Sequence, residues 1–241
     1  MIYPEKSKIF QGLFSKYILF TLKKHFQRIY ITGEENLKSD NPVIFYMNHT
    51  CWWDPLIVFY LSVMRWKYDG YAVMDLLQLT KYRFFRKFGV FSIDRQNGRE
   101  ALKSIEFAAK LLDRKERCLW IFPQGEMHPS NYRPIKFYSG ISRIISKSKP
   151  VDAVPITFHY EFIQEQRPEI FISIGKPDTF ADELMPPAKM TLFLEQKLIN
   201  NLELERERIS KKDFDHYKEI ISGKRSISAL FFSADRERKK K

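Results

Sequence analysis

Cysteine and long apolar runs are the features that this sequence has least of. It contains 241 residues and two cysteines, Cys51 and Cys118, which are too few for a disulfide framework or a cysteine-based metal site. Each lies in or beside an apolar run, so we interpret both as small buried hydrophobic residues in a reducing compartment. No run of about 18 uncharged apolar residues occurs. We therefore expect no membrane-spanning helix and, from the pattern of residues 1–6, no cleaved signal peptide.

Acidic residues are also scarce relative to basic ones. The chain has 29 Asp and Glu against 41 Lys and Arg, which gives a net charge of +12, and 15% of its residues are aromatic. Such a composition is typical of proteins that bind nucleic acid, an anionic membrane surface or an anionic substrate. Zinc-ligand spacing, an RNP-like aromatic box and a helix-turn-helix pattern are all missing from the sequence. We therefore expect no nucleic acid partner, and the membrane surface or an anionic substrate remains.

Short β-prone runs alternate along the chain with segments of helical periodicity. This order predicts an α/β fold: a single domain with a mixed, mostly parallel central sheet flanked by helices, plus an N-terminal amphipathic helix. We expect strands at residues 30–33, 43–47, 71–74, 89–95, 118–122, 151–158 and 169–175. We expect helices at residues 7–28, 55–67, 98–117, 139–147, 187–208 and 212–222, and a segment that is helical or partly so at residues 76–88. The boundaries that we predict are 1–29 for the N-terminal helix, 30–223 for the domain and 224–241 for a basic, mobile tail.

Residues 7–28 combine lysines with apolar residues at helical spacing. The apolar positions include Ile9, Phe10, Leu13, Phe14, Tyr17, Ile18 and Leu22. Two interpretations stay open, because length and periodicity do not separate them: the helix lies in a membrane interface, or it packs on the core of the domain. The aromatic and basic segment at residues 81–88 has the same composition and favours the membrane.

The stretch from Asn48 to Pro55 has the features of a catalytic turn. The apolar run 42–47 predicts a buried strand before it, and the apolar residues after Pro55 predict a helix. Open α/β sheets usually place their chemistry at such a turn. His49 and Asp54 are spaced to form a pair in which the carboxylate orients an imidazole general base. The alternative is that Asp54 only caps the helix, and that His49 is one more polar group at a strand end.

Four motifs occur in order along the chain, each at or near an expected strand end. They are Asn48-His49-x4-Asp54, Gly89…Asp94-Arg95, Phe122-Pro123-Gln124-Gly125 and Val154-Pro155-Ile156. In this order and at these spacings, they resemble the four blocks of the glycerolipid acyltransferase superfamily, typified by 1-acylglycerol-3-phosphate acyltransferase. The resemblance runs from about residue 30 to residue 176. It therefore covers most of the predicted α/β domain.

The third block departs from the family pattern. Gln124 stands where the family has Glu, Glu126 where it has Thr, and Met127 where it has Arg. The resemblance implies that this block and Arg95 contact the acceptor, often through a phosphate, to which arginine binds bidentately. The chain therefore lacks one of the cations with which the family binds a phosphate-bearing acceptor.

The resemblance also implies a set of substrate-contacting residues. These are Asn48, Gly89, Asp94, Arg95, Phe122, Pro123, Gln124, Gly125, Glu126 and Pro155. Arg133 or Lys136 is a candidate to supply the missing cation, and we include Arg133 in the expected site. The alternative for both is solvated loop charge, which contributes little.

The resemblance and the chemistry of these residues together predict an O-acyltransferase. His49 removes a proton from an acceptor hydroxyl, the oxygen attacks the carbonyl of an acyl thioester, and Asp54 orients His49. The turn at Gly125 is expected to offer a backbone N–H to the oxyanion. The expected acceptor is a lysophospholipid-type hydroxyl. The alternatives are a non-phosphate acceptor such as a glycosylated lipid or pigment alcohol, a thioesterase, and an inactive membrane-binding module.

The same prediction defines partners and location. Acyl-CoA or acyl-carrier protein is expected as co-substrate, with no metal and no bound cofactor. A lipid acceptor has to be met at a lipid surface, so we expect a peripheral protein at the cytoplasmic face of a membrane.

Overall fold

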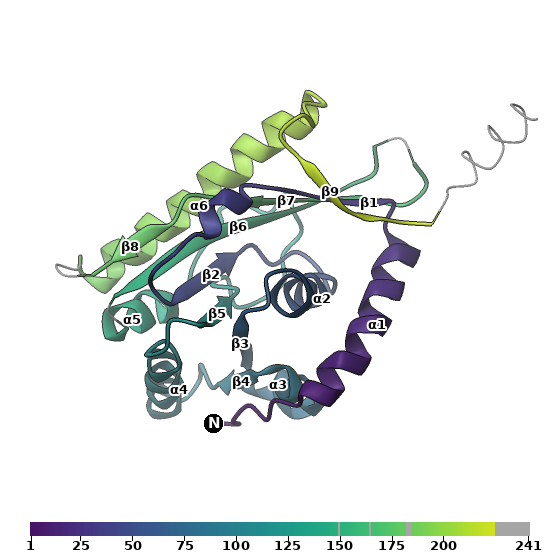
Figure 1. Ribbon diagram of the computed structural model, residues 1–241. Helices are drawn as coiled ribbons and strands as arrows, with labels where there is room; N and C mark the ends of the chain where they lie inside the picture. The colour runs from purple at the N-terminus through teal and green to yellow at the C-terminus, as the bar shows by residue number, and fades with distance from the viewer. Residues whose placement is uncertain (149, 164, 182–184, 225–241) are drawn as a thin grey trace, which may run out of the picture.

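The central sheet runs through the whole molecule (Figure 1). The computed structural model describes residues 1–148, 150–163, 165–181 and 185–224, so the expected basic tail lies outside the described residues except for Lys224. In this part of the chain nine strands form one sheet in the order β4-β3-β5-β2-β6-β7-β1-β9, and β8 pairs with β6. The strands are β1 Arg28–Thr32, β2 Val43–Met47, β3 Asp69–Asp75, β4 Val90–Ile93, β5 Arg117–Ile121, β6 Val151–Glu161, β7 Glu169–Ile174, β8 Asp178–Phe180 and β9 Lys218–Ser222.

Helices cover both faces of this sheet (Figure 1). They are α1 Lys8–His25, α2 Asp54–Phe59, α3 Leu76–Lys81, α4 Gly98–Leu111, α5 Gly140–Lys147 and α6 Pro187–Ser210. Every side chain of β2 is buried, and alternate residues point to opposite faces. Phe45 and Met47 pack with α1 and α2 in one core, while Ile44 and Tyr46 pack with α4, α5 and α6 in the other. The predicted mixed α/β fold with flanking helices is confirmed.

Parallel pairing brings several strand ends to one edge of the sheet. Strand β2 is parallel to β5 and β6, and β3 is parallel to β4 and β5. The antiparallel pairs are β6 with β7, β6 with β8, and β1 with β9. The carboxyl ends of β2, β4 and β5 therefore meet, and these are the ends that carry the first three motifs.

The fourth motif lies inside the sheet. Pro155 pairs in register with Tyr46 on β2. On the other side of β6, pairing with β8 ends at Ala153 and pairing with β7 begins at Ile156. Proline has no N–H to donate, so it fits the point where the strand changes neighbours. This is a structural role where a substrate contact was expected.

The secondary structure differs from the prediction at two places. Residues 212–222 do not form a helix, since β9 (Lys218–Ser222) adds to the edge strand β1 and buries Ile221 against the core. The short strand β8 was not predicted. Residues 76–88, expected to be helical or partly so, form α3 and, after Tyr82, a 3-10 helix, Arg83–Phe88. Pairing with β1 overrides the local helical propensity at β9.

The N-terminal helix has two apolar stripes rather than one. Ile18 and Leu22 are fully buried in the core beside α2, which confirms that the helix packs on the domain. A second stripe faces outward, with Ile9 80%, Leu13 69% and Phe20 55% exposed. None of the helices that the structure describes is long and apolar enough to cross a membrane.

Candidate active site

The first three motifs come together at the carboxyl edge of the sheet. The Gln124 side chain accepts a hydrogen bond of 2.9 Å from the His49 backbone N–H, which joins the first motif to the third. A Cβ at Gly125 would lie 2.4 Å from the Arg95 guanidinium, which joins the third to the second. Residues from three separate strand ends therefore form one site, as the family resemblance implied.

His49 and Asp54 form a close pair. The distance from His49 Nδ1 to Asp54 Oδ2 is 2.7 Å, and the Asp54 side chain has no exposed surface. The His49 ring stacks on Phe122, with ring centroids 4.1 Å apart. Because Nδ1 is occupied by the carboxylate, Nε2 is the nitrogen left to exchange a proton. The imidazole is thus held in the orientation that a general base requires.

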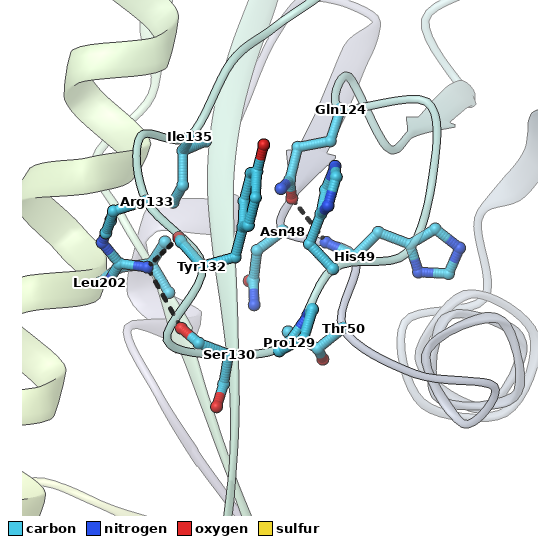
Figure 2. Close-up of a pocket in the computed structure, with 11 residues that line it drawn as sticks. Asn48, His49, Thr50, Gln124, Pro129, Ser130, Tyr132, Arg133, Ile135 and Leu202 are labelled. Carbon is cyan, nitrogen blue, oxygen red and sulfur yellow. Dashed lines mark hydrogen bonds between the residues drawn. The ribbon is translucent and has the colours of Figure 1, made fainter.

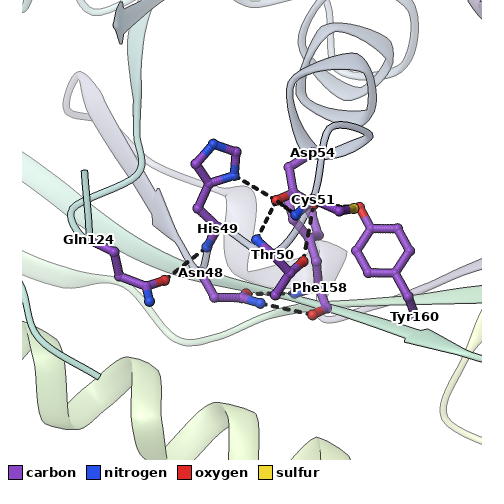
Figure 3. A network of polar contacts seen from close by, with 8 residues as sticks. All are labelled: Asn48, His49, Thr50, Cys51, Asp54, Gln124, Phe158 and Tyr160. Carbon is purple, nitrogen blue, oxygen red and sulfur yellow. Dashed lines mark hydrogen bonds and ion pairs between the residues drawn. The ribbon is translucent and has the colours of Figure 1, made fainter. Parts of the chain in front are cut away.

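The Asp54 carboxylate is held from several directions (Figure 3). Besides His49, Oδ2 accepts from the backbone N–H groups of Thr50 at 2.7 Å and Cys51 at 3.0 Å. Trp53 is the cap position of α2, and Asp54 is the first helical residue. Its hydrogen bonds run back into the turn rather than forward into the helix, so the capping interpretation is wrong. Asp54 instead closes the turn around His49.

Tyr160 supplies a contact that the sequence did not indicate. Its hydroxyl donates to Asp54 Oδ1 at 2.5 Å from strand β6 (Figure 3). Burial raises the pKa of Tyr160 well above its ordinary value, and the nearby negative charge of Asp54 raises it further. The phenol therefore stays protonated and donates. Tyr160 and Phe158 share a face of β6, which pairs with β2, but only the register of the two strands places the hydroxyl on Asp54.

Asn48 braces the end of β2. Its side-chain amide donates to the Phe158 carbonyl and accepts from the Phe158 N–H, both at 2.9 Å. The side chain is buried, and both ends of its amide are used by the protein. Asn48 therefore holds the strand that carries His49, where a substrate contact was expected.

The loop after β5 is fixed to the first motif on both sides. His128 donates its backbone N–H to the His49 carbonyl at 2.9 Å, while the Gln124 side chain binds the His49 N–H. Gln124 is 5% exposed, so its side chain is largely enclosed by the protein. Pro123 is buried, and its carbonyl accepts from the Tyr138 N–H. Glu126 is exposed and lies 3.5 Å from His128.

Gly125 has a structural reason to be glycine. Its φ of 75° is the left-handed region, and a Cβ there would collide with Arg95 and Tyr138. Its N–H donates to the Phe122 carbonyl at 3.0 Å, so the Gly125 amide is not the free oxyanion donor that was expected. The next amide in the turn, that of Glu126, has no acceptor among the described residues.

The second motif is split between the two ends of β4. Asp94 and Arg95 follow the strand at the site edge, and Asp94 accepts from the Gln96 N–H in the turn that follows. Gly89 precedes the strand, at the opposite end, where its φ of 95° and its closeness to Lys6 explain the glycine. Gly89 therefore shapes the fold and does not line the site, contrary to expectation.

Arg133 is engaged by the protein itself. It forms an ion pair with Glu203 at 2.5 Å and donates to the carbonyls of Ser130 and Tyr132. It borders a cavity of about 10 Å³ beside His49, which is room for one water molecule (Figure 2). Figure 2 shows its guanidinium turned onto the loop carbonyls. It does not supply the free second cation that was considered.

The comparisons agree with this geometry. The acyltransferase family model matches residues 28–159, which is more than half of the chain. No curated protein matches the sequence. Among solved structures, the 1-acyl-sn-glycerophosphate acyltransferase PlsC from Thermotoga maritima is similar, with a TM-score of 0.55, 17% identity and 80% of each chain covered. The structural likeness confirms the fold that the resemblance implied, and the family model shows that the chain belongs to the acyltransferase family.

Proposed function

We propose that this acyltransferase moves a fatty acyl group from a thioester donor to the hydroxyl of a lysophospholipid-type acceptor, with His49 as general base. The observation that carries the proposal is the His49–Asp54 pair, 2.7 Å apart, at the strand edge where three motifs meet. The donor is acyl-CoA or acyl-carrier protein as co-substrate, and the reaction needs no metal and no bound cofactor.

The reaction follows from the position of the imidazole. His49 Nε2 takes the proton of the acceptor hydroxyl as its oxygen attacks the thioester carbonyl, and Asp54 stabilises the imidazolium that forms. The tetrahedral intermediate then collapses, the carbon–sulfur bond breaks, and the imidazolium returns a proton to the thiolate. The products are the ester and the free thiol, and His49 is neutral again.

The oxyanion needs a donor in the turn after β5. The Gly125 amide is already used by Phe122, whereas the Glu126 amide has no acceptor among the residues that the structure describes. We therefore assign the backbone N–H of Glu126 as the oxyanion donor. This donor needs a tight turn at position 125. Glycine makes that turn, because the positive φ found there is costly for any other residue.

Peripheral binding to an anionic membrane is part of the proposal. The exposed stripe of α1 lies beside the 3-10 helix 83–88, since Phe14 contacts both Phe84 and Phe88. Phe84 is 42% exposed and Leu77 on α3 is 71% exposed, which extends the apolar surface. Exposed lysines on α1, among them Lys16 and Lys23, border it. Apolar side chains flanked by lysine suit the interface of an anionic membrane, and thioester donors of the cytosol place the protein on the cytoplasmic face.

Thiol release from acyl-CoA tests the function. The purified protein is expected to release thiol only when a lipid acceptor with a free hydroxyl, such as a lysophospholipid, is present, with ester product formed in equal amount. Thiol release without any acceptor indicates a thioesterase instead. Absence of release with every donor and acceptor indicates a membrane-binding module without activity.

A further inference from the structure

A second cavity shares Gln124, His128 and Tyr132 with the small cavity beside His49. It measures about 240 Å³ and is lined in part by Gln124, Glu126, His128, Lys136 and Tyr138. Gln124 and His128 both hydrogen-bond the His49 backbone, so the cavity shares a wall with the proposed base. The Tyr138 ring also lies against Gly125. The Arg95 guanidinium lies over this ring, with 4.9 Å between its Cζ and the ring centroid. The cavity is therefore in the position where the polar part of an acceptor would be held.

The charges around this cavity cancel. Arg95 is paired with Asp75 on β3, with 3.6 Å between nitrogen and oxygen. Lys136 lines the cavity and forms no ion pair with any residue that the structure describes, but Glu126 lines the same cavity with a side chain 64% exposed. The two cations are thus matched by two carboxylates. A phosphate monoester, which carries nearly two negative charges, would meet no net positive charge here.

Arg133 does not change this balance. It lines the smaller cavity beside His49, and its guanidinium is paired with Glu203 at 2.5 Å. Two loop carbonyls take two more of its hydrogen bonds. To bind a phosphate it would have to give up these contacts.

Aromatic rings form much of the remaining wall. Tyr132 stacks on His128 with ring centroids 4.2 Å apart and planes 7° apart. Tyr132 is 44% exposed and Tyr138 is 54% exposed, so both offer a ring face or a hydroxyl to a ligand. Aromatic faces together with a carboxylate and an amide bind hydroxyl-rich or ammonium-bearing groups well. They offer little to a dianion.

We propose, on the basis of the acyl transfer proposed above, that the acceptor is a lipid alcohol whose head group has no net charge. A sugar head group and a zwitterionic head group share this chemistry. In both cases Glu126 and the tyrosines contact the head group, while Lys136 and Arg95 are balanced by Glu126 and Asp75. A phosphate monoester is the poor acceptor.

A competition assay tests this inference. The full chain receives one long-chain acyl-CoA and equal amounts of three acceptors in the same neutral detergent: lysophosphatidate, lysophosphatidylethanolamine and a monoacylated glycosyl glycerol. We expect the two uncharged or zwitterionic acceptors together to exceed lysophosphatidate by about tenfold, the effect of 1.4 kcal/mol. The ratio between the products of those two acceptors shows whether the zwitterionic or the sugar head group is preferred. Preferred acylation of lysophosphatidate overturns the inference and leaves the acyl transfer intact, whereas transfer to none of the three overturns both.

A variant that changes the charge of the cavity tests the same inference independently. Glu126→Gln removes one negative charge from an exposed position, so the share of lysophosphatidate is expected to rise about threefold. Glu106→Gln is the matched control, because Glu106 is a half-exposed carboxylate on α4 that is paired with Lys147. It is expected to leave the ratio unchanged. An unchanged ratio in a folded Glu126→Gln protein contradicts the inference.

Discussion

The Tyr160 hydroxyl donates a hydrogen bond of 2.5 Å to Oδ1 of Asp54, the carboxylate oxygen opposite to the one that contacts His49. Strand β6 therefore fixes the carboxylate that fixes the proposed base. A hydrogen bond to a charged group is worth about 1.5–3 kcal/mol, which is enough to decide the orientation of a carboxylate. Tyr160 is a positioning residue in this arrangement, because it reaches His49 only through Asp54.

Tyr160→Phe is expected to lower kcat by about tenfold, the equivalent of 1.4 kcal/mol, and to alter its pH dependence. Without Tyr160, Oδ1 of Asp54 keeps the weaker contacts with Thr50 Oγ1 at 3.4 Å and Cys51 Sγ at 3.6 Å. Asp54 then interacts more strongly with the imidazolium, so the acidic limb of the kcat/KM profile is expected to move to higher pH. Tyr217→Phe is the matched control, since Tyr217 donates to the buried carboxylate of Glu205 away from the site. A pH profile that is identical in Tyr160→Phe and the parent contradicts the positioning role.

His49→Ala is expected to reduce turnover by a factor of about 10²–10⁴, the usual contribution of a general base. The effect on stability is expected to be small, because His49 is at a strand end and its backbone makes the hydrogen bonds to Gln124 and His128. Steady-state kinetics and a urea titration measure the two quantities. His216→Ala, at an exposed histidine, serves as control. Near-normal acyl transfer by His49→Ala would refute the proposed mechanism.

Asp54→Asn is expected to keep the fold and lower kcat by a large factor, at most about 10⁴, because a neutral amide cannot stabilise the imidazolium that forms at His49. One amide oxygen still accepts from the Thr50 and Cys51 N–H groups, so the turn is retained. The measurement is kcat together with the melting temperature. If the variant is fully active and normally stable, Asp54 has no part in catalysis.

The fold and the paired residues were predictable because they depend on local patterns. Strand β2 is apolar over its whole length, and it ends directly before Asn48 and His49. Parallel strands bring their carboxyl ends together, so the meeting of His49, Arg95 and Gln124 follows from strand order. Gly125 was recognised as a turn residue for the same reason, since proline and glycine mark turns in any context.

Contacts that depend on strand register were not predictable. Tyr160 reaches Asp54 only because β6 lies beside β2 in one register, and Pro155 is in the sheet because β6 changes neighbours there. The ion pair between Arg133 and Glu203 was not predictable either, since the two residues are 70 positions apart in the sequence. The helix expected at 212–222 fails for the same reason, because a free sheet edge selects a strand for β9.

The stability of the protein is expected to fall as the pH falls from 6.5 to about 4, because the buried His159 resists protonation in the folded chain. Burial lowers the pKa of this histidine from 6.5 to about 4, the nearby Glu203 opposes the shift and Arg133 adds to it. Below pH 6.5 the unfolded chain binds a proton at His159 more readily than the folded chain does. The free energy of unfolding therefore falls by about 2 kcal/mol between pH 7 and pH 5 through this group. In urea titrations at the two pH values, His159→Leu is expected to lose about 2 kcal/mol less than the parent. Equal losses would show that His159 does not titrate in this way.

Binding to anionic vesicles is expected to depend on the outward stripe of α1. Removing residues 1–28 is not a suitable test, because Ile18 and Leu22 belong to the core. The double substitution Leu13→Ser and Phe20→Ser leaves those residues in place and is expected to weaken flotation with anionic vesicles about tenfold. Leu192→Ser is the control, since Leu192 is 60% exposed but lies on α6. Binding of the parent is expected to fall with added salt, because each lysine near the surface contributes about 1 kcal/mol that salt screens. Equal flotation of the double variant and the control would place the membrane contact elsewhere on the molecule.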